Sequence, residues 1–158
     1  MKIVVREYRP TDWDSVKDMI LNAENFGDVF LEHERTKLGV YSKNPAYGRV
    51  FVAEDTESQE VVGFTAVRID WSALVISTII VHHKHLRQGI GSALVEEVVR
   101  FGKSRPNIET IWVDTGDFML YAQEFYKSCG FDEVARVPHY MSSDFHQVFF
   151  IRRIKVDE

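Results

Sequence analysis

The sequence predicts an α+β fold, in which a mixed, mostly antiparallel central sheet is flanked by helices on both faces. Two β-branched apolar runs, residues 50–54 and 60–68, are separated by a short polar turn, as in an antiparallel hairpin. A third run at residues 75–81 follows another turn, so three consecutive strands are expected to be joined as hairpins. A parallel sheet of the dinucleotide-binding kind would alternate strands and helices from the start. The order of the elements therefore disfavours that fold.

Length, composition and charge narrow the class of protein. The chain has 158 residues, 45% of them apolar, which is enough for a globular core, and we expect one domain over residues 1–158. The net charge of −5 argues against a nucleic-acid partner, because nucleic acid attracts a basic surface. No apolar run is long enough to cross a membrane or to form a signal peptide. With a single cysteine, Cys129, these features predict a cytoplasmic protein with no membrane partner.

The first third of the chain predicts one strand and two helices. Residues 3–8 alternate in polarity as a strand does. Thr11 and Asp14 have the spacing of a capping box, which predicts a helix with Thr11 as its N-cap. Residues 22–27 interrupt the helical pattern, and a second helix is expected over about residues 29–42, shortly before a proline.

The residues Gln88-Gly89-Ile90-Gly91-Ser92 join the third apolar run to a helix. That helix is indicated by apolar residues at helical spacing, namely Ile90, Leu94, Val98 and Phe101. Glycines let a ligand approach the backbone, and the first amides of a helix have no intrahelical acceptor, so this turn suits a phosphate group. The same glycines would also serve a tight turn that binds nothing.

Three phosphate-binding loops can be compared with this turn. A nucleoside triphosphate loop needs four residues between its glycines and then Lys-Ser/Thr, which are absent. A dinucleotide loop needs a third glycine where Leu94 stands, and neither Glu109 nor Asp114 fits its ribose carboxylate well. The pyrophosphate arm of coenzyme A is the third alternative.

The last third of the chain predicts strand, helix and strand over residues 110–115, 118–129 and 147–154, with Gly130 ending the helix. One face of this helix carries apolar residues that we interpret as core, namely Phe118, Ala122, Phe125 and Cys129. We interpret Cys129 as a packed thiol rather than a nucleophile, since no histidine lies near it in the sequence.

Three histidines, His82, His83 and His85, precede the glycine turn, and His139 and His146 could join them in a metal site. Histidines this closely spaced in a polar link more often face water. We therefore expect no metal ion.

The segment Leu86-Arg-Gln-Gly-Ile-Gly91 resembles the acetyl-CoA-binding motif of the GCN5-related N-acetyltransferases (the GNAT family), Arg/Gln-x-x-Gly-x-Gly/Ala, although Leu86 replaces Arg/Gln. The segment Ala122-Gln-Glu-Phe-Tyr-Lys-Ser-Cys-Gly-Phe131 is similar to the same family's Ala-x-x-Leu/Phe-Tyr-x-x-x-Gly-Phe, at the family's distance. Three residues before that alanine the family has an asparagine, and this chain has Met119. The two segments together cover about residues 60–135.

The resemblance implies a GNAT-like acyl-CoA N-acyltransferase fold, whose fourth and fifth strands, here about residues 74–82 and 109–115, splay apart. Acetyl-CoA is the implied cosubstrate, and its pantetheine arm would lie in the opening beside Ile79, Ile80, Val81 and Met119. The pyrophosphate would bind backbone amides of the turn, which come from Arg87, Gln88, Gly89, Ile90, Gly91 and Ser92. Tyr126 matches the family's general acid, and the resemblance requires no metal ion or side-chain nucleophile.

The implied reaction moves the acetyl group to a primary amine of a small molecule or a protein, by direct attack on the thioester. The general base stays open among Glu54, Asp114, His139 and an ordered water chain, and a homodimer stays open too. The acceptor pocket is expected between residues 22–30 and 137–145. Acidic residues there that could meet a cation are Glu24, Asp28 and Asp144, while Phe26 and Phe30 are expected in the core.

Two other classes of function remain open at this stage. A CoA-binding module without catalysis is motivated by Leu86 and Met119, which depart from the family pattern. A dinucleotide-binding oxidoreductase is motivated by Gly89-Ile90-Gly91 alone.

Overall fold

The computed structural model describes residues 1–23 and 27–155. Within them the α-helices are α1 (Trp13–Leu21), α2 (Asp28–Lys43), α3 (Ile90–Lys103) and α4 (Leu120–Ser128), and two short 3-10 helices span Pro10–Asp12 and His83–His85. The strands are β1 (Ile3–Glu7), β2 (Gly48–Asp55), β3 (Glu60–Asp70), β4 (Ala73–Val81), β5 (Thr110–Gly116), β6 (Asp132–Pro138) and β7 (His146–Arg153). No helix of the described residues is both long and apolar enough to span a lipid bilayer.

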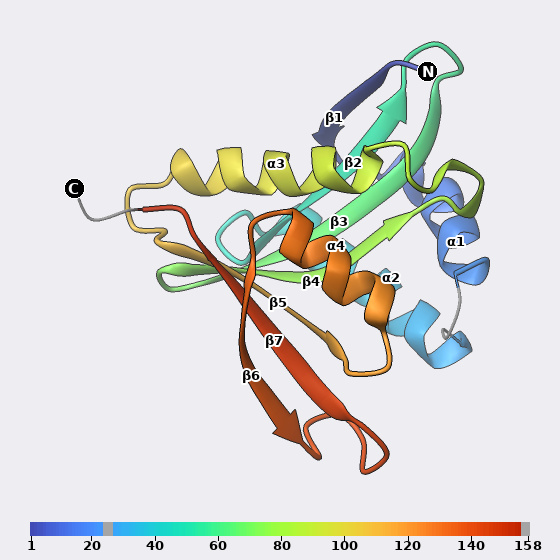
Figure 1. The fold of residues 1–158 in the computed structure, drawn as a ribbon. Helices are drawn as coiled ribbons and strands as arrows, with labels where there is room; N and C mark the ends of the chain where they lie inside the picture. Colours follow the sequence, from blue (N-terminus) through green and yellow to red (C-terminus); the bar gives the residue numbers. More distant parts are fainter. Residues whose placement is uncertain (24–26, 156–158) are drawn as a thin grey trace.

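The described strands form one mixed sheet in the order β1-β2-β3-β4-β5-β7-β6. Every neighbouring pair is antiparallel except β4 and β5, which run parallel. Those two strands pair only from Ala73↔Thr110 to Ile76↔Val113, although both continue further. They diverge beneath α4 in Figure 1. The predicted fold class and the predicted splay between the fourth and fifth strands are both confirmed.

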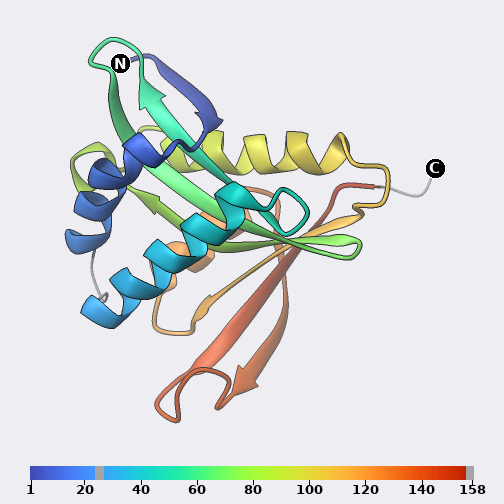
Figure 2. The ribbon, with the colours of Figure 1, turned by 180° about the vertical axis from the view of Figure 1, so that it is seen from behind.

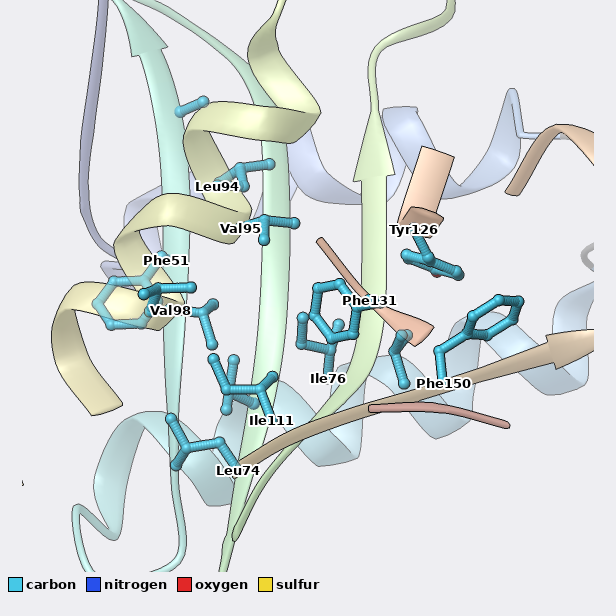
Figure 3. Close-up of a cluster of buried hydrophobic side chains, with 14 of the residues drawn as sticks. Phe51, Leu74, Ile76, Leu94, Val95, Val98, Ile111, Tyr126, Phe131 and Phe150 are labelled. Carbon is cyan, nitrogen blue, oxygen red and sulfur yellow. The ribbon is translucent and has the colours of Figure 1, made fainter. Parts of the chain in front are cut away.

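Helices cover both faces of the sheet. Figure 1 shows α3 and α4 in front of it, and the reverse view in Figure 2 shows α1 and α2 on the other side. Successive side chains of a strand point to opposite faces. Phe51 of β2 therefore packs between the sheet and the α3/α4 layer, and Val52 packs between the sheet and the α1/α2 layer. The larger core lies on the α3/α4 side, and Figure 3 shows Leu94 and Val98 of α3 within it. Burying such a side chain contributes about 1.5–3 kcal/mol.

The predicted start of the first helix is wrong in detail. The opening turn has Arg9, not Thr11, as its N-cap, and Asp12 rather than Asp14 supplies the capping carboxylate, because its Oδ2 accepts the backbone N–H of Arg9 at 2.7 Å. Pro10 fits the first position of the turn, since it has no N–H to satisfy, and the turn begins before Thr11. The Arg6 guanidinium adds two hydrogen bonds of 2.9 Å to the same carboxylate.

Two elements of the last third differ from the prediction. The helix begins at Leu120, and Phe118 lies before it and is 54% exposed, whereas Gln123 and Tyr126 are its buried residues. Strand β6 was not predicted, because this edge strand is almost wholly exposed and lacks the alternating apolar pattern. It pairs with β7 in antiparallel fashion.

Candidate active site

A cleft of about 1800 Å³ opens where β4 and β5 diverge. Its lining comes from β4, from the start of α3, from β5 and from α4. The end of β3, α2, β7 and the connection between β6 and β7 complete it. The cleft therefore passes through the sheet from the α3/α4 layer to the α2 side.

One wall of the cleft is a strand edge that no neighbouring strand pairs. His82 donates its N–H to Val62 O at 2.8 Å, and Ile80 lies opposite Phe64 in the same register. Hydrogen-bonded and non-bonded residues alternate along an antiparallel pair, so the backbone groups of Ile79 and Val81 point away from β3 and toward the opening. An extended ligand could pair with this edge as an added strand does.

The end of the cleft beside α3 offers free backbone amides. The first intrahelical bond joins Ala93 N to Gly89 O at 3.0 Å, so the amides of Ile90, Gly91 and Ser92 precede the helical pattern. Gly89 has a φ of 80°, which glycine adopts without strain, and no atom lies within 4 Å of the position of a Cβ there. Together with the positive end of the helix dipole, this open turn suits an anion.

The structure brings nine of the ten expected cofactor-binding residues to the cleft. They are Ile79, Ile80, Val81, Arg87, Gly89, Ile90, Gly91, Ser92 and Met119. Gln88 is exposed and does not line it. Leu86, which departs from the family motif, lines the cleft and is half exposed, and the guanidinium of Arg87 lies 5.8 Å from the ring of Tyr121.

Tyr126 lies on α4 and reaches the cleft from within the core. It is 7% exposed, and its ring packs against Phe131 and Phe150 at centroid distances of 6.1 and 5.7 Å (Figure 3). Burial, with smaller contributions from Asp114 and Cys129, raises the pKa of Tyr126 well above its usual value of about 10. The hydroxyl therefore stays protonated at neutral pH and above it.

Asp114 is the only one of the three candidate bases to line the cleft within the described residues. Glu54 Oε2 instead accepts a hydrogen bond of 2.6 Å from Arg6 Nε, and His139 is exposed. Nε2 of Gln147, on β7, donates a hydrogen bond of 2.7 Å to Asp114 Oδ2. Asp114 follows Val113, whose side chain belongs to the Tyr126 layer, so Asp114 points to the opposite face. Asp114 and Tyr126 thus approach the cleft from the two faces of the sheet.

The α2 side of the cleft carries a polar network that the sequence analysis missed. Glu34 is fully buried, and its Oε1 accepts hydrogen bonds of 2.6 Å from Lys37 Nζ and from Thr78 Oγ1. Lys37 and Thr78 line the cleft. The helical spacing of Glu34 and Lys37 was the only sequence signal, because Thr78 comes from a distant strand.

The segments expected to form the acceptor pocket contribute only in part. Phe30, Tyr140, Met141 and Phe145 line the cleft, whereas Asp28 and Asp144 do not. Phe30 also packs on the smaller core, as expected. Glu24 and Phe26 lie outside the described residues.

His82 and Cys129 are both held in their neutral forms. His82 and His83 stack at 4.6 Å, and no group of three metal-binding side chains occurs in the described parts of the chain. Burial lowers the pKa of His82, with help from His83 and His85, so it is neutral at pH 7. Burial raises the pKa of Cys129, which keeps it a thiol.

A sheet that opens between two parallel strands, with free helix amides at one end of the opening, is the architecture of an acyl-CoA-dependent acyltransferase. The chain belongs to the acetyltransferase (GNAT) family, whose family model matches residues 13–131. Fully buried Leu94 stands where a dinucleotide loop would need its third glycine, which agrees with this assignment.

Solved structures of GNAT proteins share the fold. A GNAT-family protein from Desulfovibrio desulfuricans has 15% identity and a TM-score of 0.86, covering 98% of this chain and 100% of that one. The ribosomal-protein-S18-alanine N-acetyltransferase of Escherichia coli has 18% identity and a TM-score of 0.81, covering 99% and 97%. An aminoglycoside 6'-N-acetyltransferase complexed with coenzyme A has 19% identity and a TM-score of 0.77, covering 98% and 99%. No curated protein sequence matches the chain.

Acetyl-CoA is the cosubstrate of this family, and the cleft fits it. The unpaired edge of β4 suits the amide-bearing pantetheine arm, and the amides of α3 suit the pyrophosphate. Both features belong to the one cleft.

Proposed function

We propose that this protein transfers an acetyl group from acetyl-CoA to a primary amine, by direct attack of the amine on the thioester. The observation that carries the proposal is that Tyr126 and Asp114 line one cleft from opposite faces of the sheet. That cleft ends at the free amides of α3. In this proposal Tyr126 is the proton donor and Asp114 the proton acceptor on the two sides of the bound thioester.

The residues that hold acetyl-CoA are those of the β4 edge and the α3 turn. Backbone groups of Ile79 and Val81 would pair with the pantetheine arm, and amides of Ile90 to Ser92 would bind the pyrophosphate. Met119 would contact the arm through apolar packing in place of the amide hydrogen bond of asparagine. Holding both reactants in line supplies a large part of the rate by proximity.

Acetyl-CoA supplies an activated acyl carbon, and the chain's own residues manage the protons. A bond forms between the amine nitrogen and the acyl carbon, and the bond from that carbon to sulfur breaks. Asp114 accepts the proton that converts the bound ammonium group into the attacking amine, with Gln147 holding the carboxylate in place, and the second proton of the nitrogen passes to solvent after the attack. Tyr126 donates its hydroxyl proton to the departing sulfur and regains one from solvent afterwards. An N–H of the β4 edge polarises the acyl oxygen.

Thermal unfolding with acetyl-CoA, CoA and NAD at equal concentration tests the cofactor half of the proposal. A ligand at about 100 times its Kd stabilises the native state by about 2.7 kcal/mol, which raises Tm by roughly 5–10 °C in a protein of this size. We expect this shift with acetyl-CoA and CoA and no shift with NAD. A shift with NAD alone would contradict the proposal.

The transfer itself is tested by release of free thiol from acetyl-CoA in the presence of amines. Leu86 and Met119 differ from the residues of the family motif, and they favour a second candidate function, a CoA-binding module without catalysis. That candidate predicts the thermal shift but no amine-dependent thiol. Thiol release above the rate without amine, together with the acetylated amine in the mass spectrum, distinguishes the enzyme from the module.

A further inference from the structure

We infer that the acceptor carries a single ammonium group on an apolar, preferably aromatic, body. This inference rests on the proposed transfer and concerns the acceptor half of the same cleft. It is drawn from the charges, the unpaired polar atoms and the aromatic side chains of that half.

The described lining of the cleft contains two carboxylates, Asp70 and Asp114. Asp70 is 3.8 Å from the guanidinium of Arg68, which also lines the cleft, so its charge has a partner. The remaining cation on the acceptor side, Lys37, is bound to Glu34 behind the lining. Asp114 is therefore the one carboxylate in the described lining that no cationic side chain pairs.

The surroundings of Asp114 suit one ammonium group. Gln147 uses its Nε2 on Asp114 Oδ2, while its own Oε1 is buried and has no hydrogen-bond partner in the described structure. A buried carbonyl oxygen without a donor is costly, because it has lost its hydrogen bonds to water and gained none in exchange. An ammonium group has three donors and would satisfy Gln147 Oε1 and Asp114 together. Gln147 therefore positions the carboxylate and also offers an acceptor of its own.

The walls around this pair are aromatic. Phe149 lies opposite Asp114 in the β5–β7 register, so the two side chains share a face, and Trp112 shares it two residues earlier. The ring of Tyr140 meets Phe149 edge-on at a centroid distance of 5.0 Å. All three rings line the cleft. Figure 2 shows α1 and α2 over the first strands, with β6 and β7 left uncovered by a helix on this side.

A polyamine or an aminoglycoside fits this half poorly. Each further ammonium group would have to leave water against aromatic rings without a second unpaired carboxylate in the described lining. A flat apolar body would gain from Trp112, Phe149 and Tyr140 instead. The same chemistry occurs in a small aralkylamine and in a peptide amino terminus with an aromatic first residue.

Calorimetric titration of the CoA-loaded protein tests the inference without relying on turnover. The probes are 2-phenylethylamine, a tetrapeptide amide with N-terminal phenylalanine, ethylamine and spermidine. We expect 2-phenylethylamine or the peptide to bind at least tenfold more tightly than spermidine, and comparison of those two identifies the source. Asp114→Asn keeps a hydrogen-bonding partner for Gln147 and removes the charge, and it weakens this binding at least tenfold. Equal or tighter binding of spermidine, or no binding of either aromatic probe, overturns the inference.

Two variants test the aromatic wall in the thiol-release assay. Tyr140 is exposed and Phe149 lies beside it. Phe149→Ala and Tyr140→Ala are each expected to raise the KM for 2-phenylethylamine by roughly 3–10-fold. The KM for ethylamine is expected to stay within about twofold of the wild-type value. Tyr47→Ala, at an exposed tyrosine outside the cleft, is the matched control and changes neither. Equal effects on both amines overturn the aromatic assignment.

The failures of the two proposals are distinguishable. Efficient thiol release with spermidine keeps the acetyl transfer and overturns the single-ammonium acceptor. Selective binding of the aromatic probes without any thiol release supports the acceptor class and contradicts the transfer.

Discussion

A Cβ atom placed on Gly91 would lie 2.9 Å from Cζ of Phe125, a contact too short for any real side chain. Gly91 is in the first turn of α3, and Phe125 precedes the proposed acid Tyr126 on α4, with the two rings 5.5 Å apart. The absence of a side chain at Gly91 therefore lets α3 and α4 approach each other.

Gly91→Ala and Gly39→Ala are expected to change stability in opposite directions. At Gly91 the ring of Phe125 must move, and such overpacking costs about 1–3 kcal/mol, which outweighs the roughly 0.5–1 kcal/mol that alanine gains in a helix. At Gly39, inside α2, no atom lies within 4 Å of the added carbon, so only the gain remains. Chemical denaturation of both variants measures the sign of each change in the free energy of unfolding. A stabilising Gly91→Ala would show that the α3–α4 contact is looser than described.

Ser92→Glu is expected to weaken CoA binding at least tenfold without destabilising the fold. Ser92 is exposed in the first turn of α3, where a carboxylate interacts favourably with the helix dipole but repels a bound pyrophosphate. Ser92→Gln has nearly the same size and no charge, so it is the matched control. Titration with CoA at low and high salt measures the effect, which salt should reduce. Equal affinity of both variants would place the pyrophosphate elsewhere.

Tyr126→Phe is expected to lower kcat by about 10²–10⁴-fold and to leave the KM for acetyl-CoA nearly unchanged, because only the proton donor is lost. The ring keeps its core contacts, so Tm stays close to that of the wild type. Tyr121→Phe, at an exposed tyrosine on the same helix and in the same cleft, is the control. A Tyr126→Phe enzyme at the wild-type rate, under conditions where chemistry limits turnover, would remove Tyr126 from the mechanism.

The alkaline side of the pH profile follows from the raised pKa of Tyr126. Because the folded protein holds this proton more tightly than the unfolded chain, Tyr126 stays protonated and kcat is expected not to fall between pH 8 and pH 10. The associated stability is complete below the unfolded pKa of about 10 and is lost as the pH rises through the raised value. Wild type should therefore lose Tm relative to Tyr126→Phe only above about pH 10. A relative loss near pH 8 would contradict the sign of the shift.

Local patterns predicted most of the fold, and nine of the ten residues expected to bind the cofactor line the cleft. Helical periodicity behind Gly91 identified α3, and the motif around Tyr126 identified the family. The predicted start of α1 was wrong because Asp12, three residues after Arg9, accepts the backbone N–H of Arg9, so the first turn begins before Thr11. Strand β6 could not be predicted, because it is an exposed edge strand. Without a buried face, its sequence does not alternate between apolar and polar residues.

The acceptor half could be predicted only in part, because its contacts join residues that are distant in the chain. Gln147 binds Asp114 across 33 positions, and Lys37 binds Thr78 across 41. Asp114 was one of several equal candidates in the sequence, and only its place in the cleft separates it from Glu54, which is bound to Arg6.

Lys37→Met is expected to be strongly destabilising, by about 3–5 kcal/mol, since it leaves the fully buried carboxylate of Glu34 without its cation. In a protein of this size the loss corresponds to a fall in Tm of roughly 6–20 °C. Thr78 continues to donate to Glu34 Oε1, but Oε2 already lacks a partner among the described residues, so the charge stays poorly compensated.

The double variant Glu34→Leu, Lys37→Met is expected to recover most of that stability, because replacing both members of a buried ion pair by apolar residues is often neutral. Lys17→Met, at an exposed lysine of α1, is the control and shifts stability by less than about 0.5 kcal/mol. Thermal unfolding of the wild type and the three variants at pH 7 measures the cycle. If the Tm of Lys37→Met equals that of the wild type, the ion pair contributes nothing to the stability of the fold. The ammonium group of Lys37 would then be available to a ligand in the cleft that it lines.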